Sequence, residues 1–317
     1  MILRTLRPMR TDLVAHDPDL APLRRAARAG DWNGVSAYFA ALPPRADHSS
    51  AVRLVATTSG TEKFLQAAVD AERDAALPRT LLGARFITVG WAARTRAQAR
   101  YVSQAQWRVF HDYIGRAERL LADATAIDPT DAAAWTERIT TARALSLGLD
   151  EARRRYERAA EHCDAPYRAQ AQLVQNLCPK WGGTFSEVIA FAEQCLRDGK
   201  PGSLSGAVVA DAHIERAVGD ETLSAMQRYL GQDGPREALE RAAEQTVLHP
   251  DFRPVHGWIA AHSAFAFALY YGGHYRQTAP HFDALDLRIT SYGWELVGTR
   301  WQQTAHTARR AARRAAR

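Results

Sequence analysis

The stretch Leu177–Cys195, LCPKWGGTFSEVIAFAEQC, decides how the chain folds. On both sides of its centre, apolar residues recur at three- and four-residue intervals, which is the spacing of one face of an α-helix. The centre itself is Pro-Lys-Trp-Gly-Gly, which does not favour a continuous helix. The stretch therefore predicts two helices joined by a tight turn, with Trp181, Gly182 and Gly183 as the structural turn.

The rest of the chain has the same pattern of helical segments interrupted by turn residues. Ala, Leu, Arg and Glu recur at helical spacing almost throughout, whereas runs of β-branched residues with two-residue alternation are missing. Gly and Pro interrupt the pattern at short intervals, so the helices should be of ordinary length with short connections. The sequence predicts an all-α fold of stacked helical hairpins.

Three segments share a template in which a glycine is followed, two positions later, by an aromatic residue. The glycine ends one helix, because a residue without Cβ turns most easily, and the aromatic residue opens the next helix. Later residues at helical spacing should face the first helix of the pair. The glycine, the aromatic and the facing residues are Gly30, Trp32, Val35, Phe39 and Leu42; Gly183, Phe185, Val188, Ala192 and Cys195; and Gly273, Tyr275, Thr278, Phe282 and Leu285.

This pattern resembles the tetratricopeptide repeat, a hairpin of two helices with small residues where the helices meet and a closing proline. The best match, AERLLADATAIDPTDAAAW, places Ala117, Leu121, Ala124, Pro129 and Trp135 in the family's order and spacing. A weaker match supplies Ala238, Ala242 and Pro250. In addition, Gly115, Gly148 and Gly183 are 33 and 35 residues apart, close to the family's period of roughly 34.

The resemblance implies a right-handed α-solenoid, which uneven spacing of the turns should make degenerate and compact. We expect an N-terminal basic leader at 1–17, a divergent helical region at 18–97, tetratricopeptide-like repeats at 98–290, and a C-terminal helix with an Arg-rich tail at 291–317. The segment PKWGG also resembles an uncharacterised bacterial helical family with Trp-Gly-Gly before a helix, which supplies no activity to carry over.

The net charge of +6 is mainly a property of the tail. The last nine residues carry five arginines and no acid, and without these five the chain has 36 basic and 35 acidic residues. A solvated helix end is the simpler interpretation. The alternative, nucleic-acid binding through Arg309–Arg317, predicts affinity that falls steeply with salt, and we do not expect it.

Composition also bears on the compartment. Three cysteines without a CxxC pair suit a reducing cytosol. The longest apolar run, Trp258–Tyr271, is too short to span a bilayer, and no signal-peptide pattern is present. We expect a cytoplasmic protein with no membrane contact, and the Ala and Arg content indicates a high-GC bacterial source.

Motifs for cofactors, metals and nucleophiles are missing. The histidines form no HExxH and pair with no CxxC, so we expect no metal. No GxSxG elbow and no GxGxxG after a strand occur, so we expect no cofactor. The segment DAHIE contains Asp211, His213 and Glu215, for which a solvated helix face is the simpler interpretation.

The tetratricopeptide resemblance implies that a ligand lies on the concave surface made by the first helix of each hairpin. Arg143, Gln170, Lys180 and Tyr270 are then expected to point inward, a mixture suited to a peptide carrying acidic groups. Aromatic residues near Tyr270, namely Phe265, Phe267 and Tyr271, cannot all share one helix face, which makes a groove or pocket plausible there.

Two hypotheses follow. The first is a non-enzymatic, cytosolic helical-repeat interaction protein that binds a peptide or partner protein on its concave face. The alternative is an enzyme of specialised metabolism that encloses a small apolar substrate in a helical cavity, with His213 or His262 transferring a proton. An open groove with polar inward residues would favour the first, and a closed pocket with converging polar groups would favour the second.

Overall fold

The computed structural model describes residues 7–95, 99–220 and 222–317. Within these ranges the chain is helical, and extended pairing is limited to an isolated bridge between Arg10 and Arg288. The prediction of an all-α chain is confirmed. None of the helices in these ranges is both long enough and apolar enough to cross a bilayer.

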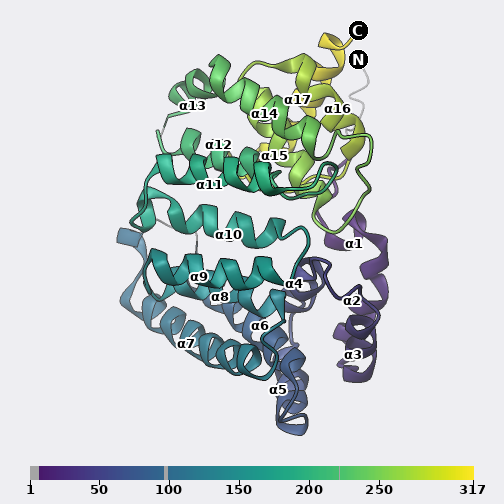
Figure 1. Ribbon diagram of the computed structural model, residues 1–317, viewed down its shortest axis with the longest axis vertical. Coiled ribbons are helices and arrows are strands. Elements are labelled where there is room, and N and C mark those ends of the chain that lie inside the picture. Colours follow the sequence, from purple (N-terminus) through teal and green to yellow (C-terminus); the bar gives the residue numbers. More distant parts are fainter. Residues whose placement is uncertain (1–6, 96–98, 221) are drawn as a thin grey trace. The chain divides into compact units, whose positions relative to one another are not determined.

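The chain divides into two compact units. Unit 2 comprises Pro18–Gly183, and unit 1 comprises Thr184–Arg317 together with the segment that ends at Asp17. The break at Pro179–Gly183, which the sequence places inside one helical hairpin, thus falls where unit 2 ends. Figure 1 labels most of the helices along the chain.

Unit 2 is built from nine α-helices in its described residues. They are α2 (Ala21–Ala29), α3 (Trp32–Ala40), α4 (Ser49–Thr57), α5 (Glu62–Ala71), α6 (Ala76–Arg94), α7 (Gln104–Ile127), α8 (Ala132–Ala144), α9 (Leu149–Glu161) and α10 (Tyr167–Leu177), with the 3-10 turns η1 (Pro18–Leu20), η2 (Ala99–Tyr101) and η3 (Pro179–Trp181).

Unit 1 has eight α-helices in the part that the structure describes. They are α1 (Leu13–His16), α11 (Phe185–Asp198), α12 (Val208–Val218), α13 (Leu223–Leu230), α14 (Asp233–Gln245), α15 (Trp258–Tyr271), α16 (Tyr275–Leu285) and α17 (Trp301–Ala315), with the 3-10 turn η4 (Trp294–Val297).

The three glycine and aromatic segments open helices as predicted. Trp32, Phe185 and Tyr275 are the first residues of α3, α11 and α16. Side-chain caps fix two of these starts, because Asp31 accepts from the amide of Gly34 (3.0 Å) and Thr184 accepts from the amide of Glu187 (3.2 Å). The residues predicted to face the first helix are buried, except Leu42, which is half-buried.

The turn glycines differ in what they require. Gly30 and Gly273 adopt the left-handed conformation (φ 67° and 81°), as the template predicts. In the Trp-Gly-Gly turn the left-handed residue is Gly182 (φ 98°), not Gly183. Gly183 is needed for another reason, since a Cβ there would overlap the carbonyl of Leu177.

The glycine period used to align the repeats is only partly reflected in the structure. Gly148 precedes α9 with a left-handed φ of 92°, whereas Gly115 lies inside α7 and makes no turn. A glycine can be tolerated inside a long helix because neighbouring residues supply the helix propensity. Of the three glycines that gave the period, Gly115 therefore marks no boundary between helices.

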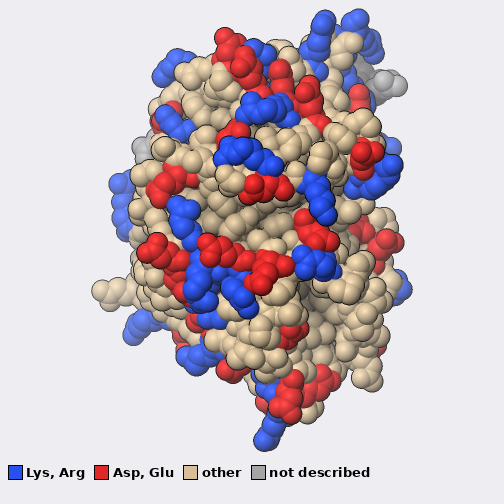
Figure 2. Space-filling model, viewed as in Figure 1, with Lys and Arg blue, Asp and Glu red and all other residues tan. Residues whose placement is uncertain are grey.

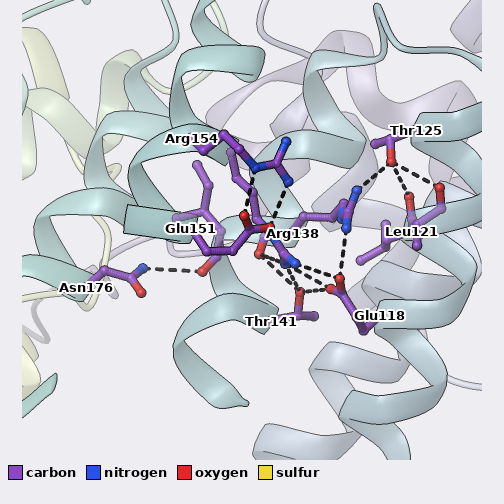
Figure 3. A network of polar contacts seen from close by, with 11 residues as sticks. Glu118, Leu121, Thr125, Arg138, Thr141, Glu151, Arg154 and Asn176 are labelled. Carbon is purple, nitrogen blue, oxygen red and sulfur yellow. Dashed lines mark hydrogen bonds and ion pairs between the residues drawn. The ribbon is translucent and has the colours of Figure 1, made fainter. Parts of the chain in front are cut away.

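An ion network ties α7, α8 and α9 together (Figure 3). Glu118 of α7 accepts from Arg138 of α8 (3.0 Å) and from Arg155 of α9 (2.7 Å), and the hydroxyl of Thr141 also donates to it. Arg155, whose side chain is only 3% exposed, donates further to Glu151 (2.6 Å). A buried charge is tolerated here because its partners are in place. The network fixes α8 against α7 and α9.

The core of unit 1 is built around α15. This helix is buried on nearly all sides, with Phe265 and Phe267 fully enclosed, and Trp294 of η4 packs against Phe267 with ring centroids 5.3 Å apart. The groove suggested by the aromatic residues of α15 is therefore wrong for Phe265 and Phe267. They form the core, because α12, α13, α14 and α16 all pack on α15.

The Arg-rich tail forms the end of α17. Arg309 pairs with Asp286 (3.2 Å) and Arg313 pairs with Asp283 (3.1 Å), so two of the five tail arginines neutralise acids at the end of α16 and just beyond it. Elsewhere, on the face drawn in Figure 2, basic and acidic side chains are interspersed and form no large patch of one sign.

Candidate ligand-binding cavity

A cavity of about 710 Å³ lies entirely within unit 2. This volume is in the range of pockets that hold a small molecule or a few side chains of a partner. Four helices and one 3-10 turn form its walls. The lining residues are Arg53, Ala56 and Thr57 of α4; Ala84, Ile87, Thr88, Trp91 and Arg94 of α6; Glu137, Thr140 and Arg143 of α8; Arg168, Gln172 and Gln175 of α10; and Lys180 and Trp181 of η3.

Positive charge dominates this lining. Each of the five elements supplies one cation, whereas the lining contains one acid, Glu137. Basic residues therefore exceed acidic residues by four around the cavity. The five cations are Arg53, Arg94, Arg143, Arg168 and Lys180.

Glu137 is the negative counterpart inside the cavity. Burial raises the pKa of its carboxyl group above the ordinary value, while Arg168, Arg53 and Arg143 act in the opposite direction and Asp47 adds to the rise. Arg53 keeps exposed surface, yet burial of part of its side chain and the like charge of Arg168 together lower its pKa to about 10, against the opposing effect of Glu137. Arg53 and Arg168 are thus close enough to repel each other electrostatically.

Arg143 is held in position by neighbours that also line the cavity. Its guanidinium donates to Oε1 of the buried Gln172 (3.1 Å), which also accepts from the hydroxyl of Thr140 (3.0 Å). The guanidinium lies against two indole rings, 5.9 Å from the centroid of Trp91 and 5.8 Å from that of Trp181. These contacts orient the charge before any ligand arrives.

The structure brings together some of the predicted binding residues and separates others. Arg143 and Lys180 line the same cavity, together with Trp181 from the predicted turn. Gln170 is buried in unit 2 and does not line this cavity. Tyr270 belongs to unit 1, where its ring stacks on Trp294 with centroids 6.1 Å apart. As binding residues, these four stay a prediction.

The sequence reasoning missed the other charged residues of the cavity. Arg53, Arg94, Glu137 and Arg168 belong to elements that lie far apart in the chain. One local signal was available for Arg53, which interrupts the apolar run Ala51–Ala56 of α4. Arg53 is exposed between buried neighbours, so it marks the face of α4 that is not packed in the core.

His213, one of the two alternative catalytic histidines, lies outside this cavity. It is buried in α12, and its Nδ1 lies 2.7 Å from the hydroxyl of Tyr229 of α13. Burial lowers the pKa of His213 to about 4, with Arg241 contributing, and burial raises the pKa of Tyr229 to about 12. Both groups are therefore neutral near pH 7.

His262 is likewise buried, in α15 of unit 1. Its Nδ1 lies 3.0 Å from Nδ1 of His281 of α16, so one ring donates and the other accepts. Burial lowers the pKa of His262 to about 4, and burial followed by the effect of His262 lowers that of His281 well below its ordinary value. The two imidazoles form a neutral pair.

The solvated face expected for DAHIE is wrong. Asp211, His213 and Glu215 are all buried, and Tyr292 donates to Glu215 (2.8 Å). The reason is that α12 packs on α11, α13, α14 and α15, which leaves it no open face. Among the described residues, no three histidine, cysteine, aspartate or glutamate side chains gather closely enough to share a metal ion.

Neither a protein-family model nor a curated protein matches this chain. The resemblances to the tetratricopeptide repeat and to the Trp-Gly-Gly family therefore stay predictions, with which the all-helical fold agrees. The fold and the site together define an all-helical protein with a cation-lined cavity.

Proposed function

We propose that the protein is an interaction protein, a degenerate solenoid of helical hairpins, whose unit 2 binds an anionic segment of a peptide or partner protein. The observation that carries this proposal is the cavity of about 710 Å³ with one cation from each of five elements and a single acid. Its net positive lining suits acidic side chains, and its size suits a short stretch of a partner.

The chemistry of the lining supports an anionic ligand. Four of the five cations are arginines, whose planar guanidinium binds a carboxylate or phosphate through two parallel hydrogen bonds. Arg143 is already oriented by Gln172 and by two tryptophans. Because an oriented donor loses little conformational entropy on binding, such a site can hold an anion tightly.

The alternative of an enzyme gains no support from the two histidines. His213 contacts Tyr229, His262 contacts His281, and neither histidine lines the cavity. Their low pKa values also make them poor proton acceptors at neutral pH.

A paired peptide array tests the proposal. Full-length protein is applied to random peptides that each occur twice, once with Asp and Glu and once with Asn and Gln at the same positions. We expect the acidic member of some pairs to bind at least tenfold more tightly, because each charge-assisted hydrogen bond contributes about 1.5–3 kcal/mol.

Variants then locate the binding. The double variant Arg143→Gln/Lys180→Gln should lose most of the affinity for an acidic peptide selected on the array. Arg25→Gln, which removes an exposed arginine of α2 in the same unit but outside the cavity, should bind as the wild type does. Equal binding of acidic and amide peptides would contradict the proposal.

A further inference from the structure

The cations of the cavity are distributed in a way that bears on the shape of the ligand. No two of the five come from the same helix or turn: Arg53, Arg94, Arg143, Arg168 and Lys180 belong to α4, α6, α8, α10 and η3. A carboxylate is flat and accepts hydrogen bonds in one plane. Donors that approach from five elements instead suit an anion whose oxygen atoms point in several directions.

The neutral hydroxyls of the lining are already used as donors. Thr57 donates to the carbonyl of Arg53 (2.7 Å) and Thr88 donates to that of Ala84 (3.1 Å), each within its own helix, so the hydrogen bonds offered to a ligand come mainly from the five cations. A phosphoryl group offers three strong acceptor oxygens, one more than a carboxylate. The number of cationic donors around the cavity therefore matches a phosphoryl group better than a carboxylate.

The charge of the lining favours the same ligand. Five cations face a single acid, Glu137, whose carboxyl pKa is raised by burial. A ligand carboxylate would offset one of the four excess positive charges. A phosphate monoester carries a charge between about −1.5 and −2 near pH 7 and would offset up to two.

The apolar part of the lining indicates what the phosphoryl group is attached to. Trp91 and Trp181 meet edge to face, with ring centroids 6.4 Å apart and planes at 89°. Ala56, Ala84 and Ile87 complete the apolar lining. Such surfaces suit a carbon skeleton next to the anion, as in a phosphorylated side chain or a small organic phosphate.

We infer that the unit 2 cavity recognises a phosphoryl group, carried by a phosphorylated peptide side chain or by a free phosphate monoester. This inference rests on the cavity of the proposed function and specifies its anion. It differs from that function in a measurable way, because a carboxylate peptide satisfies the proposed function and does not satisfy this inference.

Three small probes separate charge from shape. Phenyl phosphate is tetrahedral and mostly dianionic at pH 7.5, phenyl sulfate is tetrahedral and monoanionic, and benzoate is planar and monoanionic. Binding to the full-length protein is measured by calorimetry and by tryptophan fluorescence, to which Trp91 and Trp181 contribute from the cavity wall. We expect phenyl phosphate to bind at least tenfold more tightly than either other probe.

Peptides separate the two sources of the group. A library with phosphoserine, phosphothreonine or phosphotyrosine is compared with twins that carry glutamate or the unmodified residue. Preference for phosphopeptides over both twins supports the inference and the proposed function together. Binding of phenyl phosphate without any peptide supports the inference for a free ester and overturns the peptide proposal.

Two other outcomes overturn the inference. If glutamate peptides bind as tightly as their phosphorylated twins, the proposed function stands and the phosphoryl inference fails. If no probe and no peptide binds, both fail. Binding that is found must weaken at least tenfold in Arg143→Gln and in Arg53→Gln and stay unchanged in Arg25→Gln, with far-UV circular dichroism confirming that each variant is folded.

Discussion

Unit 2 and unit 1 bury polar side chains by different means. Unit 2 encloses charges and pairs them, with Arg155 held between Glu118 and Glu151. Unit 1 also encloses two acids, Asp211 and Glu215, but it differs from unit 2 in its buried neutral rings, with His213 against Tyr229 and His262 against His281. A buried ion pair needs every partner in place, whereas a buried imidazole needs only to stay unprotonated. The two units should therefore unfold under different conditions.

Acidification should produce the largest difference between the units. His213 and His262 have a pKa of about 4 in the folded chain and about 6.5 when exposed. Between these values the unfolded chain binds more protons, so stability falls as the pH drops from 6.5 to 4. The loss should reach about 2 kcal/mol for each histidine by pH 5, measurable by urea unfolding at pH 7.5, 6 and 5.

Unit 2 should resist the same pH change. Hydrogen bonds from Arg154, and then from Arg155, hold the pKa of Glu151 at about 2, so its contribution is lost as the pH falls from its ordinary value of 4.5 to about 2, mostly below the range in which the histidines take up protons. Hydrogen exchange read by mass spectrometry should show unit 1 opening first. The variant His213→Leu/Tyr229→Phe should have a shallower pH slope, and a slope equal to that of the wild type would refute this explanation.

Breaking the ion network should be the most damaging single change in unit 2. Glu118→Leu leaves Arg138 and Arg155 without their shared carboxylate, which should cost about 3–5 kcal/mol in the free energy of unfolding. The double variant Glu118→Leu/Arg155→Met should recover part of the loss, because it also removes the buried cation. Guanidinium unfolding measures both.

The matched control is Glu161→Gln, which removes one end of the exposed pair with Arg158 in the same region. It should change stability by no more than about 0.5 kcal/mol. A loss for Glu118→Leu as small as that of Glu161→Gln would show that the buried network contributes little to unit 2.

Substitutions in the turn that ends unit 2 should lower the stability by a smaller amount. They distinguish a glycine needed for space from a glycine needed for its positive φ. Gly183→Ala places a Cβ against the carbonyl of Leu177 and should cost about 2 kcal/mol or more. Gly182→Ala has open space but a φ of 98°, and should cost about 1 kcal/mol. Thermal melts rank the two, and a reversed order would contradict the assignment.

The smallest effect concerns the acid in the cavity. Glu137→Gln removes the one negative charge of the lining and should tighten phenyl phosphate binding at pH 7.5 by on the order of 1 kcal/mol, roughly fivefold. The difference in phenyl phosphate affinity between this variant and the wild type should become smaller as the pH falls, because Glu137 takes up a proton at a higher pH than an ordinary glutamate. Asp123→Asn, an exposed acid of α7, serves as the control and should change nothing.

The fold class and many helix starts were predictable from the sequence because they depend on local patterns. Trp32, Phe185 and Tyr275 each open a helix as the template indicates. The role of Gly183 was not predictable in full, since its requirement comes from the backbone of Leu177 rather than from its own φ. The burial of DAHIE was missed because it depends on four neighbouring helices that no local pattern reveals.

The sequence by itself determined that the chain is helical, where many helices begin, and which faces of α3, α11 and α16 are buried, because helical periodicity and turn residues act over a few positions. Only the tertiary structure decided the charge of the cavity. Its cations are spread from Arg53 to Lys180 along the chain, and packing of four helices and one turn brings them together. Long-range packing also made His213 and His262 neutral, since desolvation depends on the neighbours that cover a side chain.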